Sequence, residues 1–327
     1  MRTIAGNHPD SDTVRAALGL AVRAPSLHNT QPWQWRVGGP TVHLYGDPDR
    51  YLPMTDPDGR EMLLSCDAAL HHLRIAAESL GWRTKVRRLP NPAEPEHLAG
   101  IEFSAATPTS EVITLAKAIA HRRTDRRRVT SWEVPAAHLR AMIAAGCAEG
   151  AFITEIPGGP TRIRLVEACT AAARAHAADA GYRSELIAWS GRHAATDGVP
   201  ARNAVAPADP MTREFRAHTM SEPPLCDLAD HGALLLVHTT ADDHLSRLRA
   251  GEAASAVLLR ATALGLATCP LTEPLELPGT RELVAEDILP DSGFPQMIIR
   301  IGWAATSSPP IPPTPRRPLA EVVAPMG

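Results

Sequence analysis

A polar turn at residues 25–33 is the part of the chain best suited to binding chemistry. It reads P-S-L-H-N-T-Q-P-W and places the Ser26 hydroxyl and the Asn29 amide a few residues apart. Its two prolines restrict φ and disfavour a continuous helix. Hydroxyl, amide and free backbone groups in one turn suit a flat ligand with several hydrogen-bonding atoms. His28 lies inside this turn and is a candidate catalytic side chain, although a lone histidine is more often structural.

An arginine-rich run at 121–128, reading H-R-R-T-D-R-R-R, offers the complementary chemistry. Guanidinium groups bind phosphate through charge-assisted, bidentate hydrogen bonds. A solvated helix end and a nucleic-acid patch are the alternative interpretations. Asp125 within the run, and a net charge of −3 for the whole chain, argue against nucleic acid. The turn and the run together predict a phosphorylated planar cofactor.

Two alanine-rich segments, 65–82 and 250–266, predict the central helices that position these groups. Each carries small residues along one stripe and ends in Leu-Gly, a typical helix C-terminus. A shorter amphipathic helix is expected before each, at 12–22 and at 135–145. The repeated order indicates an internal duplication, although similar alanine-rich composition alone would also produce it.

The remaining pattern predicts an α+β fold of two related halves, residues 1–108 and 109–327. An insertion at about 171–224 reads as helix and then as irregular chain, which is typical of a lid or arm. A proline-rich tail at 307–318 is expected to be extended. Strands are expected after the polar turn and at four further segments, 41–45, 84–87, 232–238 and 294–303.

Composition restricts the class of protein further. The 327 residues are 44% hydrophobic and 21% charged, which is normal for a soluble globular chain. Five cysteines without a C-x-x-C spacing argue against a disulfide scaffold or zinc knuckle and favour a cytoplasmic protein. We expect no signal peptide, no membrane span and no metal site. The G-x-G-x-x-G and H-E-x-x-H patterns are both absent from the sequence.

The turn resembles the P-S-x-x-N-x-Q-P-W motif of FMN-dependent nitroreductases, and the resemblance covers most of the chain apart from the insertion. Segment 122–126 is similar to their R-R-S-x-R phosphate motif, and 264–270 and 315–322 resemble their flavin-proximal and C-terminal segments. Ordinary nitroreductases place the arginine motif first and pair two chains around two flavins. Here the turn comes first, and G-C-A-E-G at 146–150 stands where a second turn is expected. The order resembles the actinobacterial Acg family, a fused nitroreductase dimer with one composite site.

This resemblance implies a single FMN with defined contacts. It assigns the phosphate to Arg122, Arg126 and either Arg316 or Arg317, with the Thr124 hydroxyl as a further donor. Arg123 is expected near the pyrimidine edge of the ring. A loop containing Thr272 and Glu273 is expected to present a backbone N–H to flavin N5. The flavin's polar edge and ribityl chain are assigned to the turn, through Pro25, Ser26, Asn29 and Gln31, while Trp33 is expected in the core.

The function implied is an FMN-binding oxidoreductase that passes electrons from NAD(P)H to a nitroaromatic or quinone acceptor. The alternative is a protein that stores or sequesters FMN beneath a closed insertion. Either function implies small-molecule partners and excludes nucleic acid and membrane. The chain is expected to be a monomeric pseudo-dimer, with further homodimerisation left open.

Overall fold

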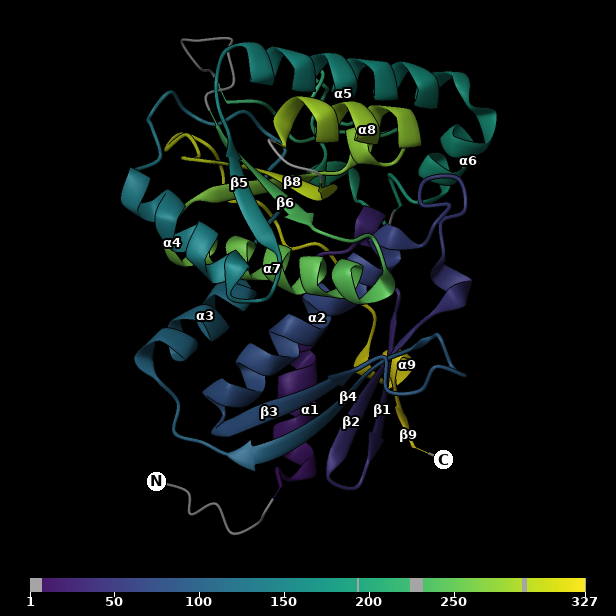
Figure 1. Ribbon diagram of the computed structural model, residues 1–327, viewed down its shortest axis with the longest axis vertical. Helices are drawn as coiled ribbons and strands as arrows, with labels where there is room; N and C mark the ends of the chain where they lie inside the picture. Colours follow the sequence, from purple (N-terminus) through teal and green to yellow (C-terminus); the bar gives the residue numbers. More distant parts are fainter. Residues whose placement is uncertain (1–7, 193, 224–231, 290–292, 327) are drawn as a thin grey trace.

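The computed structural model describes residues 8–192, 194–223, 232–289 and 293–326. Its fold is α+β, as expected, with two separate sheets and a double layer of helices between them (Figure 1). The boundary expected at residue 108 lies between strand β4 (His97–Ala105) and helix α3 (Ser110–His121). The division into two halves at that point stays a prediction.

The first sheet contains the strands that follow the polar turn. Its order is β3-β4-β2-β1-β9, and all neighbours are antiparallel except β1 and β9, which are parallel. Alternate residues of β1 and β2, among them Trp33, Trp35, Val42 and Leu44, lie in the core. Helices α1 and α2 supply the rest of that core. The bounds of these elements are α1 (Ser11–Ala21), β1 (Trp33–Gly38), β2 (Thr41–Gly46), α2 (Arg60–Ser79), β3 (Trp82–Arg88) and β9 (Val323–Pro325).

The second sheet has the order β5-β6-β8-β7, all antiparallel. Strand β6 is apolar on both faces: Leu235 and Val237 join the core with α4 and α7, whereas Leu234 and Leu236 join the core with α5 and α8. Helices therefore cover both faces of this sheet (Figure 1). The bounds are α4 (Ala136–Cys147), β5 (Phe152–Ile156), α5 (Pro160–Ala178), β6 (Ala233–Thr239), α7 (His244–Ala263), β7 (Ala267–Leu271), α8 (Pro278–Ile288) and β8 (Phe294–Gly302).

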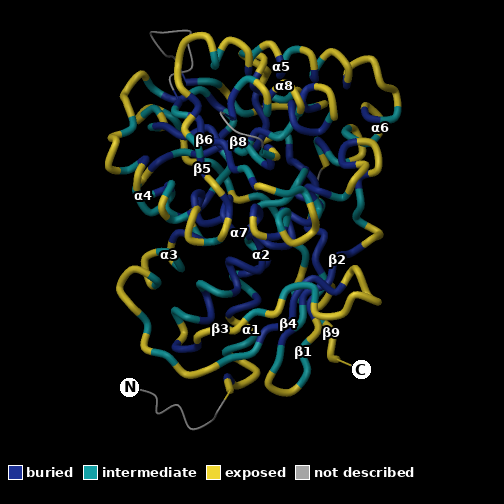
Figure 2. The backbone as a smooth tube through the Cα atoms, viewed as in Figure 1, coloured by how far each residue is buried: buried dark blue, intermediate teal, exposed yellow. Residues whose placement is uncertain are grey.

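Helices α2 and α7 pack against each other at the centre of the molecule, where the two halves meet. Figure 2 shows both as largely buried. The packing is close because α7 presents small residues: a Cβ on Gly251 would lie 2.4 Å from the carbonyl oxygen of Leu64. This contact confirms the expectation that the small-residue stripes mark central, buried helices.

The elements differ from the sequence-based expectations at a few places. Helix α2 begins at Arg60 and α7 at His244, each earlier than the expected segment. Strands β4, β5, β7 and β9 were not expected. In β4 the residues from His97 to Ile101 are all buried, so the strand lacks the alternation that indicates one. In β7 a central proline obscures the strand pattern.

The insertion and the tail have the expected character. The insertion begins inside α5, runs through α6 (Ala180–Ala188) and is then irregular except for a 3-10 turn at Ala201–Asn203. Its expected last residue, Pro224, falls outside the described residues. The tail has neither helix nor strand from 309 to 318. Within the described ranges, no helix has the length and apolarity to cross a membrane. Among the described residues, Cys66, Cys147 and Cys169 are free thiols.

Candidate functional site

Two adjoining chambers lie at the seam between the halves. The larger has a volume of about 1020 Å³ including its mouth, and the smaller about 420 Å³. Four residues line both chambers: Pro25 and Ser26 from the turn, and Thr124 and Arg126 from the arginine run. The structure thus brings together the two motifs that the sequence analysis paired.

The turn is held in a conformation that side chains rarely adopt. His28, Asn29 and Gln31 all have positive φ, at 47°, 57° and 53°. The Ser26 hydroxyl accepts a hydrogen bond from the Gln31 N–H at 2.9 Å, and the Leu27 N–H donates to the Ser65 hydroxyl of α2 at 3.2 Å. Such strain persists only where the surroundings determine it, so these bonds fix the shape that the turn presents to both chambers.

The arginine run is extended rather than helical because it docks along β7. Helix α3 ends at His121, and the Asp125 N–H donates to the Thr268 carbonyl at 2.8 Å. This pairing directs Arg122, Arg123 and Thr124 into the smaller chamber. A basic helix end, one of the alternative interpretations, does not describe this segment.

The smaller chamber has the chemistry of an anion site. Arg122 is 5% exposed, and its Nε and Nη1 atoms are buried without a partner among the described residues. Burial, together with the charges of Arg123 and Arg23, lowers the pKa of Arg122 to about 10. No acidic residue lines this chamber within the described chain. Because buried donors are normally satisfied, the orphaned guanidinium atoms imply an anionic ligand.

Arg316 lies at this chamber but is already committed to the protein. Its guanidinium donates to the carbonyls of Val22, Arg23 and Ala24 at 2.9–3.0 Å, and to Asn29 Oδ1 at 2.9 Å. Burial and the neighbouring arginines, Arg122 first, lower its pKa to about 9. Arg316 therefore fastens the tail to the end of α1 and to the turn, and adds positive potential to the chamber.

Three other expected residues lie away from their assigned positions. Gln31 and Arg317 line neither chamber; the Arg317 N–H donates to Gln31 Oε1 at 2.9 Å, so this pair joins the tail to the turn. Arg123 lines only the smaller chamber, not the larger one where a ring has room. Arg126 lines both chambers, with its guanidinium 4.8 Å from the centre of the Phe215 ring. Arg126, not Arg123, is therefore the arginine of the run that reaches the larger chamber.

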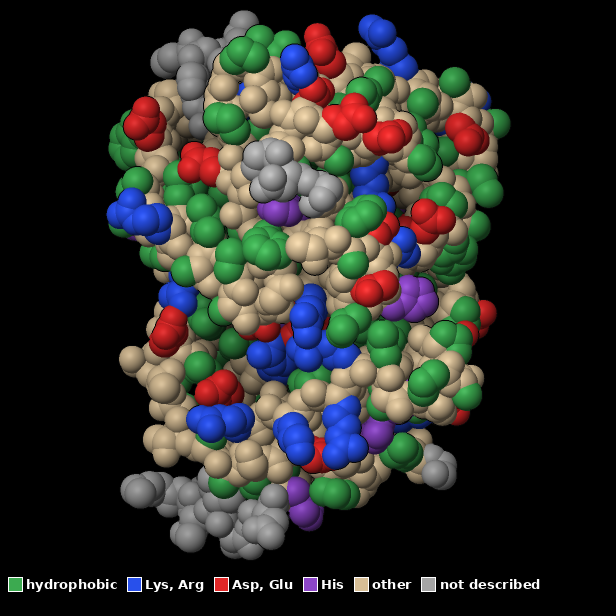
Figure 3. Space-filling model, viewed as in Figure 1, with side chains coloured by type: hydrophobic (Ala, Val, Ile, Leu, Met, Phe, Trp, Pro, Cys, Tyr) green, Lys and Arg blue, Asp and Glu red, His purple; other side chains and the backbone are tan. Residues whose placement is uncertain are grey.

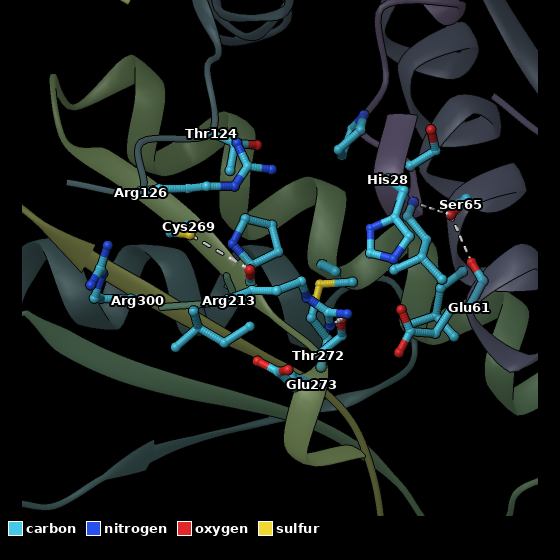
Figure 4. Close-up of a pocket in the computed structure, with 18 of the residues that line it drawn as sticks. His28, Glu61, Ser65, Thr124, Arg126, Arg213, Cys269, Thr272, Glu273 and Arg300 are labelled. Carbon is cyan, nitrogen blue, oxygen red and sulfur yellow. Dashed lines mark hydrogen bonds between the residues drawn. The ribbon is translucent and has the colours of Figure 1, made fainter. Parts of the chain in front are cut away.

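The larger chamber contains the other expected residues. Thr272 and Glu273 line it where β7 ends, and His28 points into it from the turn (Figure 4). His28 is 5% exposed, and its Nε2 has no partner among the described residues. Burial, followed by the charges of Arg213 and Arg126, holds the pKa of His28 well below 6.5. The imidazole is therefore neutral near pH 7 and offers one hydrogen-bonding nitrogen to the chamber.

Sequence reasoning missed several residues of this chamber. Arg213 comes from the insertion and is tied to the buried Glu276, with Nη1 3.1 Å from Oε2. Glu61, in the first turn of α2, points toward the chamber (Figure 4), and burial raises its pKa to about 8. No local motif marks either residue.

Comparison with known proteins places the chain in a family. It is 48% identical over 320 residues to a Mycobacterium tuberculosis protein provisionally named as an NAD(P)H nitroreductase, covering 96% of this chain and 92% of that one. A second protein of that organism, provisionally named NAD(P)H nitroreductase acg, is 39% identical over 322 residues, covering 95% of both chains. No family model matches the chain.

Two solved nitroreductase structures match part of the chain. An FMN-dependent nitroreductase from Mycobacterium smegmatis, in complex with NADPH, has a TM-score of 0.42 and 17% identity, covering 65% of this chain and 97% of that one. A nitroreductase with bound FMN from Bacteroides fragilis has a TM-score of 0.38 and 17% identity, covering 60% and 90%.

The fold and site define a class: an α+β protein with a composite cavity, lined in part by arginine side chains, at the seam between two halves of one chain. Within that class the relatives at 48% and 39% identity over nearly the whole chain decide the family. The chain belongs to the NAD(P)H nitroreductase-like family of these mycobacterial proteins, as the resemblance in its motifs predicted.

Proposed function

We propose that this protein binds one FMN across the two chambers and is an oxidoreductase of nitroreductase type. The observation that carries the proposal is the buried Arg122 guanidinium, whose Nε and Nη1 have no partner among the described residues, in a chamber that adjoins a larger one. Relatives named as NAD(P)H nitroreductases support the same activity. Nitroaromatics and quinones are the acceptor classes that we propose.

The residues present fit FMN. A phosphate carries close to two negative charges, and Arg122 and Arg123 offer free positive charge in the smaller chamber with the Thr124 hydroxyl beside them. Pro25 and Ser26, shared by both chambers, would lie along the chain between phosphate and ring. The larger chamber would hold the ring, with Thr272 and Glu273 at its edge.

Bound FMN supplies the hydride-transfer chemistry, and the protein supplies binding, electrostatics and access. Arg126 places a positive charge beside the larger chamber, which favours anionic forms of a bound ring. Neutral His28 and the carboxyl group of Glu61 are two titratable side chains at the larger chamber. Either can hold a proton or form a hydrogen bond with an electron-accepting substrate. His28 keeps its place as the candidate catalytic residue.

Flavin sequestration is the second candidate function, and one observation favours it. Residues 210–213 and Phe215 of the insertion line the larger chamber, and Arg213 is bound to Glu276 at the end of β7. An insertion fastened in this way restricts access to a bound ring. We also propose that the chain acts as a single-chain pseudo-dimer.

Two measurements test these functions. The purified protein should be yellow and should release one FMN per chain on denaturation; a colourless protein that binds no added FMN would refute both candidates. Rapid mixing of the loaded protein with NADPH and, separately, with NADH should bleach the flavin within seconds if the protein is an oxidoreductase. Persistent colour with both donors would leave sequestration as the function.

A further inference from the structure

The sequences of the two central helices, α2 and α7, can be aligned through their matching C-terminal ends. Leu80-Gly81 closes α2 and Leu264-Gly265 closes α7, and both glycines have positive φ, at 94° and 79°. Pairing these ends aligns every position of α2 with one of α7. The alignment shows which residues would stand at a second chamber if the two halves were equivalent.

Apart from Glu61, the residues of these helices that line the larger chamber are small or neutral. Helix α7 supplies Gly251, Ser255 and Leu258, and α2 supplies Ala68. For these four residues, the aligned side chains across the seam are large and ionisable, whereas Leu64 and Ala254 align with leucines. Gly251 aligns with Asp67, Ser255 with His71, Leu258 with Arg74 and Ala68 with Glu252.

Three of these four residues, His71, Arg74 and Glu252, form one network together with Arg88 and Glu149. Arg74 is bonded to both Glu149 and Glu252, and Arg88 Nε donates to Glu252 Oε1 at 2.7 Å. His71 Nε2 lies 3.6 Å from Glu149 Oε1. Figure 3 shows basic side chains gathered over the region of α2 on one face of the molecule. Arg74 and Arg88 are partly exposed, whereas Glu252 is fully buried.

Glu149 supplies an independent sign of what this network has replaced. It lies in the segment 146–150, which stands where a second polar turn would be expected. Instead of presenting hydroxyl and amide groups to a ligand, this segment sends a carboxylate onto Arg74 and His71. His71 Nδ1 also bonds the Ser255 hydroxyl at 2.9 Å, so the network reaches the wall of the surviving chamber.

We propose that this buried ion network fills the position of a second ligand chamber and takes the place of a second ligand in joining the two halves. The proposal rests on the proposed function only for the identity of the ligand in the first chamber. A cavity left at this position would cost free energy in proportion to its volume. Ionisable side chains that fill this cavity and neutralise one another's charges avoid that cost. The interface between the two halves then has room for one ligand only.

The test uses chemical unfolding of the full-length protein without flavin, so it stands even if FMN is not the ligand. Removing one partner of a buried ion pair is strongly destabilising because it strands the other charge. Glu252→Gln and Arg74→Leu should each raise the unfolding equilibrium constant by about a hundredfold. The double variant should lose much less stability than the two single variants lose together. Leu is the replacement for Arg74 because Leu258 occupies the aligned position at the larger chamber. If either single variant fails to fold while the double variant folds, the coupling is equally demonstrated.

A matched control is the exposed pair Arg87–Glu102, with side chains 67% and 46% exposed. Glu102→Gln should change stability little. Additive losses for the Arg74 and Glu252 variants, or losses no larger than that of the control, would overturn the proposal. Titration with FMN supplies a separate readout. The wild type and both single variants should saturate at one flavin per chain, and a second equivalent bound by the wild type would also overturn the proposal.

Discussion

Arg316 Nη1 donates to Asn29 Oδ1 at 2.9 Å, and so binds the end of the chain to the polar turn near its beginning. The same guanidinium caps the carbonyls of Val22, Arg23 and Ala24 as the chain leaves α1. One side chain therefore holds together the helix end, the turn and the tail. The smaller chamber is built on this junction.

Arg316→Ala should destabilise the protein even without flavin. The substitution strands buried carbonyl groups, each of which costs about 1–3 kcal/mol. We expect the free energy of unfolding to fall by at least that amount, measured by urea denaturation of the flavin-free protein. A control is Arg83→Ala, at an exposed position of β3. If Arg316→Ala weakens FMN binding but leaves the stability of the flavin-free protein unchanged, the guanidinium contacts phosphate rather than the backbone.

Arg122→Ala should show the opposite behaviour. The Arg122 Nε and Nη1 atoms have no partner among the described residues, so their removal strands no group there, and relief of repulsion from Arg123 and Arg23 favours the folded state. Affinity for FMN should fall by about 1.5–3 kcal/mol, the scale of a hydrogen bond to a charged group, which is roughly ten- to hundredfold. Fluorescence titration with FMN and with riboflavin measures this effect. Only FMN should bind more weakly, and an equal loss for riboflavin would exclude the phosphate assignment.

The sequence predicts those parts of the site that are local in the chain. The turn and the arginine run carry their chemistry within a few residues, and the paired central helices are visible in their Leu-Gly ends. It does not show Arg213 or Glu61, because each becomes functional only through packing against distant elements. Arg316 and Arg317 are equivalent in the sequence. The backbone around them decides that one caps α1 and the other pairs with Asp47.

Strands β4 and β7 show the same limit for the fold. In β4 five consecutive residues are buried, and β7 is an edge strand that contains a proline, so neither follows the alternation on which strand prediction depends. By contrast, β1 and β2 keep that alternation because one face meets α1 and α2.

Gly251→Ala tests the close approach of α2 and α7. The added Cβ would lie 2.4 Å from the Leu64 carbonyl oxygen and 2.8 Å from its Cα, both backbone atoms that cannot move alone. We expect a loss of about 1–3 kcal/mol in the free energy of unfolding, the usual cost of overpacking. Gly279→Ala in α8 is the control, because nothing lies within 4 Å of its added Cβ. A helix favours Ala over Gly, so the control should be neutral or slightly stabilising.

Asp67→Asn tests the protonation state of the Asp67 carboxyl group, which lies beside the buried ion network. Asp67 is fully buried, and neither carboxylate oxygen has a partner among the described residues. Burial, and then the charge of Glu252, raises its pKa well above 3.8. A group with a raised pKa in the folded state stabilises most below its unfolded pKa, and that stability is lost as the pH rises toward the folded pKa. The wild type should therefore lose stability above about pH 4 relative to Asp67→Asn, whose side chain cannot ionise.

Denaturation of the two proteins at several pH values measures this difference. The variant should be the more stable protein at pH 8, and its advantage should shrink toward pH 4. A constant difference across this range would show that Asp67 does not titrate on unfolding.

Arg213→Gln tests whether the insertion controls access to the larger chamber. Arg213 Nη1 lies 3.1 Å from Glu276 Oε2 and also bonds the Tyr182 hydroxyl, so it fastens residues 210–215 over the chamber. Breaking a buried pair costs roughly 3–5 kcal/mol, which should favour the open insertion by a hundredfold or more. Bound flavin should then be bleached faster by dithionite and released faster on dilution. Arg164→Gln, at the more exposed Arg164–Asp287 pair on α5 and α8, is the matched control.

The double variant Arg213→Met/Glu276→Gln separates access from the effect of a stranded carboxylate. It removes the same fastening without leaving Glu276 charged and unpaired, and should also expose the flavin. If both variants release and bleach flavin at the wild-type rate, the insertion does not limit access. A wild type that NADPH bleaches slowly, beside variants that it bleaches quickly, would instead mean that the Arg213–Glu276 contact keeps the flavin sequestered.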